Sequence, residues 1–376
     1  MASFQDSPDE VILKVIKYLD INELVKFGEV SKRMRAISND KSLWQKMNLS
    51  RDRPSWSDEF DVPTKFVKMV IENGCQYLSL HHVKVGTPRV TSREPISMKS
   101  EEHLLLEKAS NLRYLDLKYC GTHVLISEEI LSSCHLLQKL SMASIIITSK
   151  IIRSICYQNG RTLHTLDLSF CSGLNLESIQ EITKNCVGLK NVDLFATGLS
   201  IDSINFLVNN LTPEVEKLAL GFLPNLKDEH VKALVARCKK LSVLNLKHSA
   251  ISNKSLTYII ENLQHSLEKL NVRFCYSITY TVIMYNITGL KSMPKLRSLS
   301  YGQIQPFSEK DNMEKFLPLV RFGESICVDE RELLPADGIW DVPAKQLEYF
   351  KKSAKCPFIE LPDEILYSDI SVISSD

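Results

Sequence analysis

The sequence predicts an α/β fold in which a small N-terminal unit of three helices precedes a solenoid of stacked strand–helix repeats. Three observations lead to this prediction. A leucine-containing phrase recurs along the middle of the chain at a nearly constant interval, and the first fifty residues carry helix signals without that phrase. The composition, 44% hydrophobic and 24% charged in 376 residues, is that of a globular protein long enough for two packed units.

The repeated phrase is L-x-x-L-x-L, with substitutions at single positions. The central copies follow one another at an almost constant interval, and the copies start at Cys75, Leu112, Leu137, Leu163, Leu189, Val215, Leu241, Leu267 and Leu296. The period and phrase match a leucine-rich repeat, in which a short strand and a helix bury their apolar faces only by stacking on neighbouring repeats. We therefore expect a curved solenoid with a parallel sheet on the concave face and helices on the convex face.

Helices are predicted between the strands because apolar residues recur there at spacings of three and four. Examples are Ile179 with Ile182, and Ile204 with Leu207 and Val208. The predicted organisation is an N-terminal unit at residues 1–49, a linker and the start of the solenoid at 50–74, repeats at 75–302, and a C-terminal cap with an acidic tail at 303–376. From Glu324 to Asp376 the chain has twelve acidic and five basic residues. A tail folded across the concave face and a disordered tail both remain open.

Cysteines recur in the frame of the repeats, at Cys120, Cys171 and Cys275 after strands and at Cys134, Cys186 and Cys238 before them. Equivalent positions of stacked repeats form a ladder instead of converging on one point, and the chain has no C-x-x-C pair. We therefore expect buried reduced thiols, no metal site and no cofactor.

The N-terminal unit shows three helix starts. Ser7-Pro8-Asp9-Glu10 predicts a capping box with proline at the first helical position, Asp20 with Glu23 predicts a second cap, and Ser31 a third. Three short helices in about forty residues form a small core, and units of that size usually need a partner, a metal or disulfides for stability.

The same segment contains Pro8-Asp9-Glu10, Leu24, Val30-Ser31-Lys32-Arg33 and Asp40-Lys41-Ser42-Leu43-Trp44, and it resembles the F-box. That resemblance implies binding to the S-phase kinase-associated adaptor protein and, through it, to cullin and RING subunits. The residues it assigns to the adaptor contact are Pro8, Ile12, Leu13, Ile16, Leu24, Val30, Leu43 and Trp44. A helical cap that seals the first repeat is the alternative interpretation.

An F-box followed by leucine-rich repeats resembles a family of substrate-recognition subunits in cullin-type ubiquitin ligases. Such a chain is non-catalytic, and its substrates in the family include phosphorylated cell-cycle proteins. The sequence has no phosphate-binding glycine loop, no H-E-x-x-H and no G-x-S-x-G, which agrees with a receptor. A leucine-rich-repeat scaffold without a ligase role is the alternative.

Alternation along the strands places the substrate-binding residues on the concave face or just beyond it. We predict that this surface includes Asp116, Asp167, Asp193, Phe195, Phe222, Lys247, Lys269, Arg273 and Phe274. The later cations could hold a phosphate, and the competing interpretation is ordinary solvated charge. The net charge of +1 and the lack of a long apolar stretch argue against nucleic acid and membrane partners, and we expect the chain in the cytoplasm and nucleus.

Overall fold

The computed structural model describes residues 7–49, 60–62, 64–81, 83–85, 109–120, 131–278 and 293–300. The chain divides into two units, Met1–Asp329 and Glu330–Asp376, and every described residue belongs to the first. The predicted C-terminal cap and acidic tail at 303–376 lie outside the described residues. No described helix is both long and apolar enough to cross a membrane.

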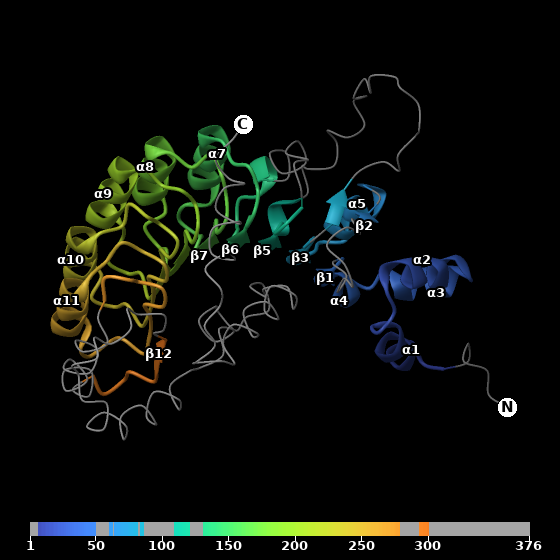
Figure 1. Ribbon diagram of the computed structural model, residues 1–376. Coiled ribbons are helices and arrows are strands. Elements are labelled where there is room, and N and C mark those ends of the chain that lie inside the picture. The colour runs from blue at the N-terminus through green and yellow to red at the C-terminus, as the bar shows by residue number, and fades with distance from the viewer. Residues whose placement is uncertain are drawn as a thin grey trace, which may run out of the picture. The chain divides into compact units, whose positions relative to one another are not determined.

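Among the described residues, ten strands of three residues each form one parallel sheet (Figure 1). Each strand of this sheet lies beside the strand of the sheet that comes next along the chain. They are β1 (Lys46–Asn48), β3 (Tyr77–Ser79), β5 (Tyr114–Asp116), β6 (Lys139–Ser141), β7 (Thr165–Asp167), β8 (Asn191–Asp193), β9 (Lys217–Ala219), β10 (Val243–Asn245), β11 (Lys269–Asn271) and β12 (Ser298–Ser300). Two further strands, β2 (Phe60–Val62) and β4 (Val83–Val85), pair separately. Every predicted copy of the leucine phrase contains one strand of the large sheet, so the prediction of a parallel sheet is confirmed.

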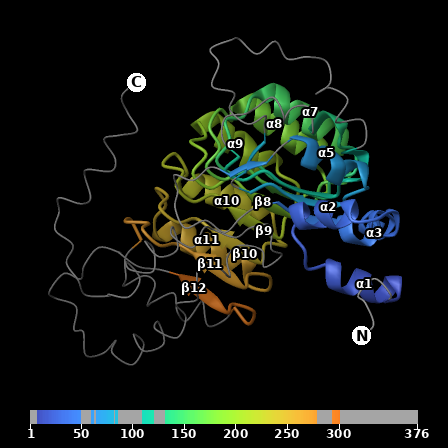
Figure 2. The same ribbon diagram turned by 90° about the vertical axis from the view of Figure 1, so that its right-hand side faces the viewer.

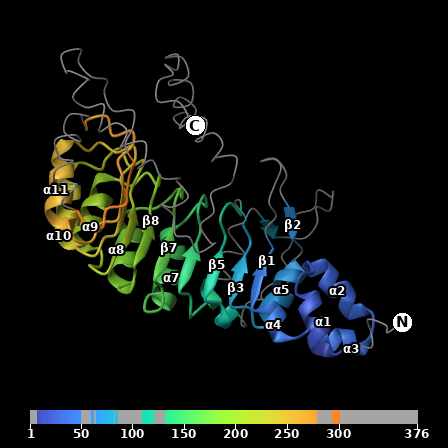
Figure 3. The ribbon, with the colours of Figure 1, turned by 90° about the horizontal axis from the view of Figure 1, so that it is seen from below.

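The first strand was not predicted, because the phrase is degraded there. Trp44, Met47 and Leu49 occupy the first, fourth and sixth positions of L-x-x-L-x-L, and β1 pairs with β3 in register Met47 to Leu78. The sheet therefore begins inside the segment 1–49 that the sequence assigned to the N-terminal unit (Figure 3). Aromatic and methionine substitutions hid this copy from a search for leucine.

In the central repeats, the strands line the inside of the arc and helices cover the other side of the sheet (Figure 1). Figure 2 shows the same helices from the side. These helices are α7 (Ser149–Asn159), α8 (Leu176–Asn185), α9 (Ile201–Asn210), α10 (Asp228–Arg237) and α11 (Asn253–Leu263). The apolar residues predicted at helical spacing are buried, with Ile179 and Ile204 both 0% exposed. The middle residues of β6, β10 and β11 are leucines that are also 0% exposed, and sheet and helices therefore share one core.

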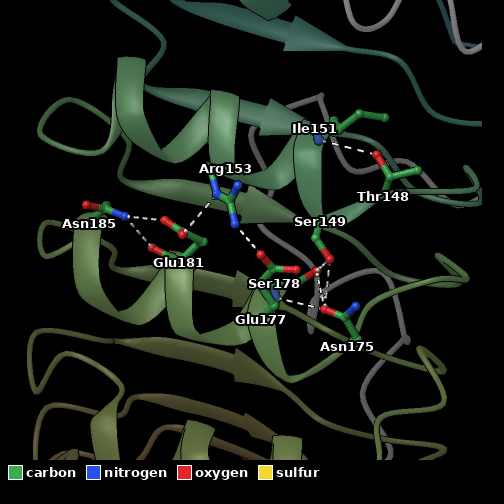
Figure 4. Close-up of polar contacts among 9 residues, drawn as sticks. All are labelled: Thr148, Ser149, Ile151, Arg153, Asn175, Glu177, Ser178, Glu181 and Asn185. Atoms are coloured by element: carbon green, nitrogen blue, oxygen red, sulfur yellow. Dashed lines mark hydrogen bonds and ion pairs between the residues drawn. The ribbon is translucent and has the colours of Figure 1, made fainter.

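Polar contacts join neighbouring repeats on the helical side (Figure 4). Arg153 of α7 forms ion pairs with Glu177 and Glu181 of α8. The Asn175 side chain accepts a bond from the Ser178 backbone at 2.9 Å and one from the Ser149 hydroxyl at 3.0 Å. One side chain thus contacts the start of the preceding helix and caps its own helix, where it satisfies one of the amide groups that the first turn leaves unpaired.

The repeat cysteines are buried as predicted except Cys120, which is half-buried, and several thiols also bond across repeats. Cys171 donates to the Met142 carbonyl at 2.9 Å, Cys275 to Leu246 at 3.1 Å and Cys120 to Leu80 at 3.0 Å. Burial raises the pKa of the Cys275 thiol to about 11, so this thiol stays protonated and can donate. Each thiol fills a corner of the core and fixes one repeat to the one before it.

The N-terminal unit consists of α1 (Asp9–Ile16), α2 (Ile21–Glu29), α3 (Lys32–Ser38) and α4 (Lys41–Trp44); α5 (Thr64–Glu72) and a 3₁₀ turn at Ala109–Asn111 follow between strands. Asp20 and Glu23 form the predicted capping box, with both bonds at 2.9 Å, and the Ser31 hydroxyl caps α3. The predicted cap at Ser7 is wrong. Pro8 is the N-cap residue of α1 and makes no side-chain bond, because proline's side chain has no acceptor.

Candidate functional site

The eight residues predicted for the adaptor contact divide into a buried and an accessible group. Ile12, Ile16, Leu24 and Trp44 are at most 4% exposed and form the core of the N-terminal unit. Pro8 and Val30 are exposed, and Leu13 and Leu43 are half-buried. The sequence pattern could not separate these groups, because a short helix that packs on one side and binds on another is apolar around most of its circumference.

Trp44 illustrates why burial changes the interpretation of a motif residue. Its side chain is 2% exposed, and the indole nitrogen donates to the Ser38 carbonyl at 2.7 Å. The ring therefore closes the contact between α3 and α4 and occupies the first position of the opening repeat. In the structure of the chain alone, Trp44 holds the fold together and offers no surface to a partner.

Apolar side chains on α1 and just after it face solvent. Val11, Val15 and Tyr18 are 46%, 48% and 81% exposed. Val11 and Val15 are four residues apart and share one face of α1, and Tyr18 lies in the turn that follows the helix. Val30, at the end of α2, adds another accessible apolar side chain, 61% exposed. We call Val11, Val15, Tyr18 and Val30 the exposed apolar set; of these, only Val30 was predicted for the adaptor contact.

The inner face of the sheet carries two rows of side chains, because the first and third residue of each strand point away from the core. The strand register aligns the first row as Lys46, Tyr77, Tyr114, Lys139, Thr165, Asn191, Lys217, Val243, Lys269 and Ser298. It aligns the second row as Asn48, Ser79, Asp116, Ser141, Asp167, Asp193, Ala219, Asn245, Asn271 and Ser300.

The first row begins with two stacked tyrosines between two lysines. The rings of Tyr77 and Tyr114 lie parallel with centroids 4.0 Å apart. The Lys46 ammonium lies 4.9 Å from the Tyr77 centroid, and that of Lys139 lies 5.2 Å from Tyr114. Two lysines thus enclose two tyrosines across four adjacent strands, an arrangement stabilised by cation–π attraction.

The second row has a backbone role that sequence reasoning missed. Oδ1 of Asp116, Asp167 and Asp193 accepts the backbone N–H two residues later at 3.0, 2.9 and 2.9 Å. Asn245 and Asn271 accept the corresponding bonds from Lys247 and Arg273 at 3.1 Å. Five of the ten positions therefore hold the strand end in an Asx turn, for which Asp and Asn are equally suited. The signal in the sequence was the repeated Asp or Asn in the fifth position of the phrase.

The charges of the aspartates are nevertheless unusual. Asp167 is 1% exposed, accepts the Ser141 hydroxyl at 2.9 Å, and lies 3.7 Å from the Lys118 ammonium. Burial raises the pKa of Asp167, and the Lys118 charge opposes that change. Asp193 lies on the adjacent strand, and burial followed by the negative charge of Asp167 raises its pKa as well. Two carboxyl groups thus share one lysine.

Aromatic rings follow the strand ends along one edge of the sheet. Neighbouring centroids lie 5.3 Å apart for Phe170 and Phe195, 5.1 Å for Phe195 and Phe222, and 4.4 Å for Phe222 and His248. His248 lies 6.3 Å from Phe274 and 6.0 Å from Tyr276. We call these six rings the aromatic row. Three of them, Phe195, Phe222 and Phe274, were predicted for substrate binding, and the constant repeat length could also have identified His248.

Basic groups accompany the later part of the aromatic row. The Lys247 ammonium lies 5.4 Å from the Phe274 centroid and 5.9 Å from that of Phe222, and the Arg273 guanidinium lies 5.3 Å from Phe274. Lys247 is only 5% exposed, whereas Lys269 and Arg273 are half-buried. Two of the three predicted cations, Lys247 and Arg273, are therefore neighbours of the predicted rings Phe222 and Phe274. Asp116, Asp167 and Asp193 belong to earlier strands.

Two family models match this chain and account for most of it. Residues 8–50 match the model described as F-box-like, and residues 67–322 match the model described as the SKP2 LRR domain, which alone covers more than half of the chain. The chain belongs to the F-box/leucine-rich-repeat family. Within this F-box/leucine-rich-repeat chain, α1 to α4 lie in the first match and β3 to β12 in the second.

One solved structure with a similar fold is described as the complex of Rad7 and Elc1 in yeast. It shares 15% sequence identity with this chain, with a TM-score of 0.45, and the match covers 67% of this chain and 64% of that one. At this distance the likeness adds nothing to the functional argument. Among the described residues of the chain, no three His, Cys, Asp or Glu side chains group as a metal site.

Proposed function

We propose that this F-box/leucine-rich-repeat chain is the substrate-recognition subunit of a cullin-type ubiquitin ligase. The F-box would bind the S-phase kinase-associated adaptor, which links it to cullin and RING subunits, and the repeats would bind the protein substrate. The observation that carries the proposal is the exposed apolar set on an F-box whose own core is already complete without it.

The exposed apolar set supports the adaptor contact for a physical reason. Ile12 and Ile16 already anchor α1 in the core at 0% and 2% exposure, so Val11 and Val15 contribute nothing to that core. Large apolar side chains left exposed on one small unit favour burial against another protein. A partner would remove these side chains from water and stabilise a unit too small for a strong core of its own.

The repeats support substrate binding without catalysis. An extended inner face lined by two rows of polar, charged and aromatic side chains is the binding surface that solenoids generally provide. Holding a substrate lysine near a conjugating enzyme raises its effective concentration there, so the receptor needs no catalytic group. We also propose a cytoplasmic and nuclear location, which rests on the reduced thiols and the short apolar stretches that the sequence predicts. A cell-cycle-related, phosphorylated substrate is proposed as well, and this point rests on the family resemblance alone.

The test compares two substitutions that introduce the same charge at similar exposure. Val15→Asp places a carboxylate in the exposed apolar set, and Val187→Asp places one at an exposed position of the repeats, 58% exposed against 48% for Val15. A buried unpaired carboxylate costs several kcal/mol in an interface, so Val15→Asp should weaken adaptor binding by roughly a hundredfold or more. Val187→Asp should leave it unchanged.

The measurement is affinity purification of full-length chain from cells with the proteasome and cullin neddylation blocked, followed by quantitative mass spectrometry. Adaptor and cullin recovered with wild type and Val187→Asp, but lost with Val15→Asp, support the ligase receptor. Adaptor absent from all three samples would indicate a leucine-rich-repeat scaffold without a ligase role. Circular dichroism of both variants confirms that the fold is retained. Trp44 is unsuitable for this test because its replacement would damage the core.

A further inference from the structure

The first row of the inner face carries lysines at regular intervals and no acidic side chain. Among its ten positions are Lys46, Lys139, Lys217 and Lys269, and the other six are uncharged. Lys46 is exposed and the other three lysines are half-buried, so all four reach the surface. The row is therefore a line of positive charge across the sheet, and we call these four residues the lysine ladder.

The acidic side chains of the second row offset only part of this charge. Asp116 and Asp167 are 5% and 1% exposed, and Asp167 lies 3.7 Å from the Lys118 ammonium. Asp193 is half-buried, and burial followed by the Asp167 charge raises its pKa to about 8, so this carboxyl group is mostly protonated at neutral pH. The inner face therefore presents mainly positive charge to a ligand.

Aromatic rings hold two of the lysines in place. The Lys46 and Lys139 ammonium groups lie 4.9 Å and 5.2 Å from the centroids of Tyr77 and Tyr114, and the two rings are stacked 4.0 Å apart. The strands β1, β3 and β5, which carry three of these residues, lie side by side in Figure 3. Cation–π attraction thus limits the positions of two long side chains before a ligand arrives, which lowers the entropy cost of binding.

The spacing of the lysine ladder is nearly constant. Lys46 on β1 and Lys139 on β6 are three strand steps apart, Lys217 on β9 is three steps further, and Lys269 on β11 is two steps beyond that. Neighbouring strands lie about 4.8 Å apart, so three steps span roughly 14 Å and two steps about 10 Å. Because an extended chain advances about 3.3 Å per residue, a segment that crosses the strands meets a lysine about every four residues.

We propose that the lysine ladder binds an extended segment of a partner protein that crosses the strands and carries acidic side chains about four residues apart. This inference deepens the proposed function, since it rests on the repeats being the substrate site. Charge complementarity selects the occupant, because each carboxylate or phosphate of such a segment would lie near one ammonium group. A nucleic acid strand fits less well, because its phosphates follow one another about every 3.4 Å along a duplex strand, against one lysine about every 14 Å.

The experiment is a selection of random dodecapeptides displayed on phage, with the full-length chain as the target. The expected result is enrichment of peptides whose acidic residues are about four positions apart. A synthetic peptide of the most enriched sequence is then measured by fluorescence anisotropy, beside a peptide of the same composition in which the acidic residues are adjacent. The regularly spaced peptide should bind at least about tenfold more tightly, and about 0.5 M sodium chloride should weaken its binding, because salt screens the attraction between exposed charges.

Charge reversals locate the binding surface. Lys139→Glu should weaken binding of the selected peptide by at least about tenfold, since it replaces an attraction with a repulsion, and a peptide with the facing acidic residue changed to lysine should recover it. Lys46→Glu, at an exposed position, should have the same effect and keeps the test decisive if Lys139→Glu proves unstable. Lys150→Glu makes the same change at an exposed position of α7, on the helical side, and is the control that should have no effect. The selected peptide with phosphoserine in place of one acidic residue distinguishes the two anions, and binding of either form supports the inference.

Several results would overturn the inference. These are no enrichment over the starting library, equal binding of the two synthetic peptides, variants Lys46→Glu and Lys139→Glu that bind as tightly as wild type, or failure of the charge exchange. A uridine oligonucleotide that binds more tightly than the peptide and depends equally on Lys139 would show nucleic acid as the occupant instead. Peptide binding that appears only after removal of residues 324–376 would show the chain's own acidic segment as the occupant. Adaptor binding that still depends on Val15 would leave the proposed function standing in each of these cases.

Discussion

Asp193→Asn replaces one of two neighbouring carboxyl groups on the inner face with an amide that cannot ionise, without removing the hydrogen bond that shapes the loop. Asp193 Oδ1 accepts the Phe195 N–H at 2.9 Å. Asn245 and Asn271 occupy the equivalent position in later repeats and accept the same bond at 3.1 Å. An asparagine at position 193 should therefore keep the Asx turn, so that the substitution isolates the effect of charge.

The sign of the effect follows from the pKa. Burial and the Asp167 charge raise the pKa of Asp193 from 3.8 to about 8, so the folded chain holds this proton more tightly than the unfolded chain does. The associated stability is fully present below about pH 4, decreases as pH rises, and is lost above about pH 8. Asparagine does not titrate, and the variant should lack this decrease.

The magnitude can be worked from the geometry. Two carboxylates one strand spacing apart, about 4.8 Å, repel by roughly 3 kcal/mol at an effective dielectric constant of about 20. Lys118, 3.7 Å from Asp167, offsets part of this repulsion. Burial of the ionised carboxylate, the larger cause of the raised pKa, adds to the remaining repulsion. We therefore expect Asp193→Asn to raise the free energy of unfolding by at least about 1 to 2 kcal/mol at pH 8.5 and by much less at pH 5.

The assay is urea denaturation followed by circular dichroism at pH 5, 7 and 8.5; urea is uncharged and does not screen the repulsion. Asp202→Asn, at an exposed position in the first turn of α9, is the matched control and should lose less than about 1 kcal/mol, with the same loss at each pH. A loss of stability for Asp193→Asn at pH 8.5, or an equal gain at pH 5 and 8.5, would refute the reasoning.

Three further predictions concern stability and are checked by urea or thermal unfolding. Trp44→Ala should cost about 3 to 5 kcal/mol within the F-box, whereas Trp44→Phe, which loses mainly the bond to Ser38, should cost about 1 kcal/mol. Asn159→Ala should cost about 2 to 5 kcal/mol because it leaves the buried Leu137 N–H and Cys134 carbonyl, bonded at 2.9 and 2.8 Å, without partners. Gly221→Val should cost about 1 to 3 kcal/mol and alter near-ultraviolet dichroism by displacing the Phe195 ring, from which a methyl group added at this glycine would lie 2.6 Å away; an unchanged spectrum would contradict this packing.

Sequence reasoning succeeded where one repeat determines its own structure. The regular recurrence of the leucine phrase located every strand of the large sheet from β3 to β12, because each strand must present an apolar residue to the shared core at the same point of the repeat. Helix caps such as Asp20 with Glu23 were also predictable, since the residues that bond lie three apart in the chain. The strand β1 was missed because Trp44 and Met47 replace leucine in its phrase.

Only the tertiary structure decided which apolar side chains of the F-box are core and which are surface, and which polar residues of the repeats meet. Val11 and Ile12 are adjacent and both apolar, yet one is 46% exposed and the other 0%, because the position of α3 determines which side of α1 is covered. The Lys118–Asp167 pair joins residues that belong to different repeats. The sequence by itself determined the repeat and its apolar core, through local periodicity. Packing between repeats determined the ion pair, the raised pKa values of the buried aspartates and the aromatic row, because those contacts depend on the order and register of the stacked repeats.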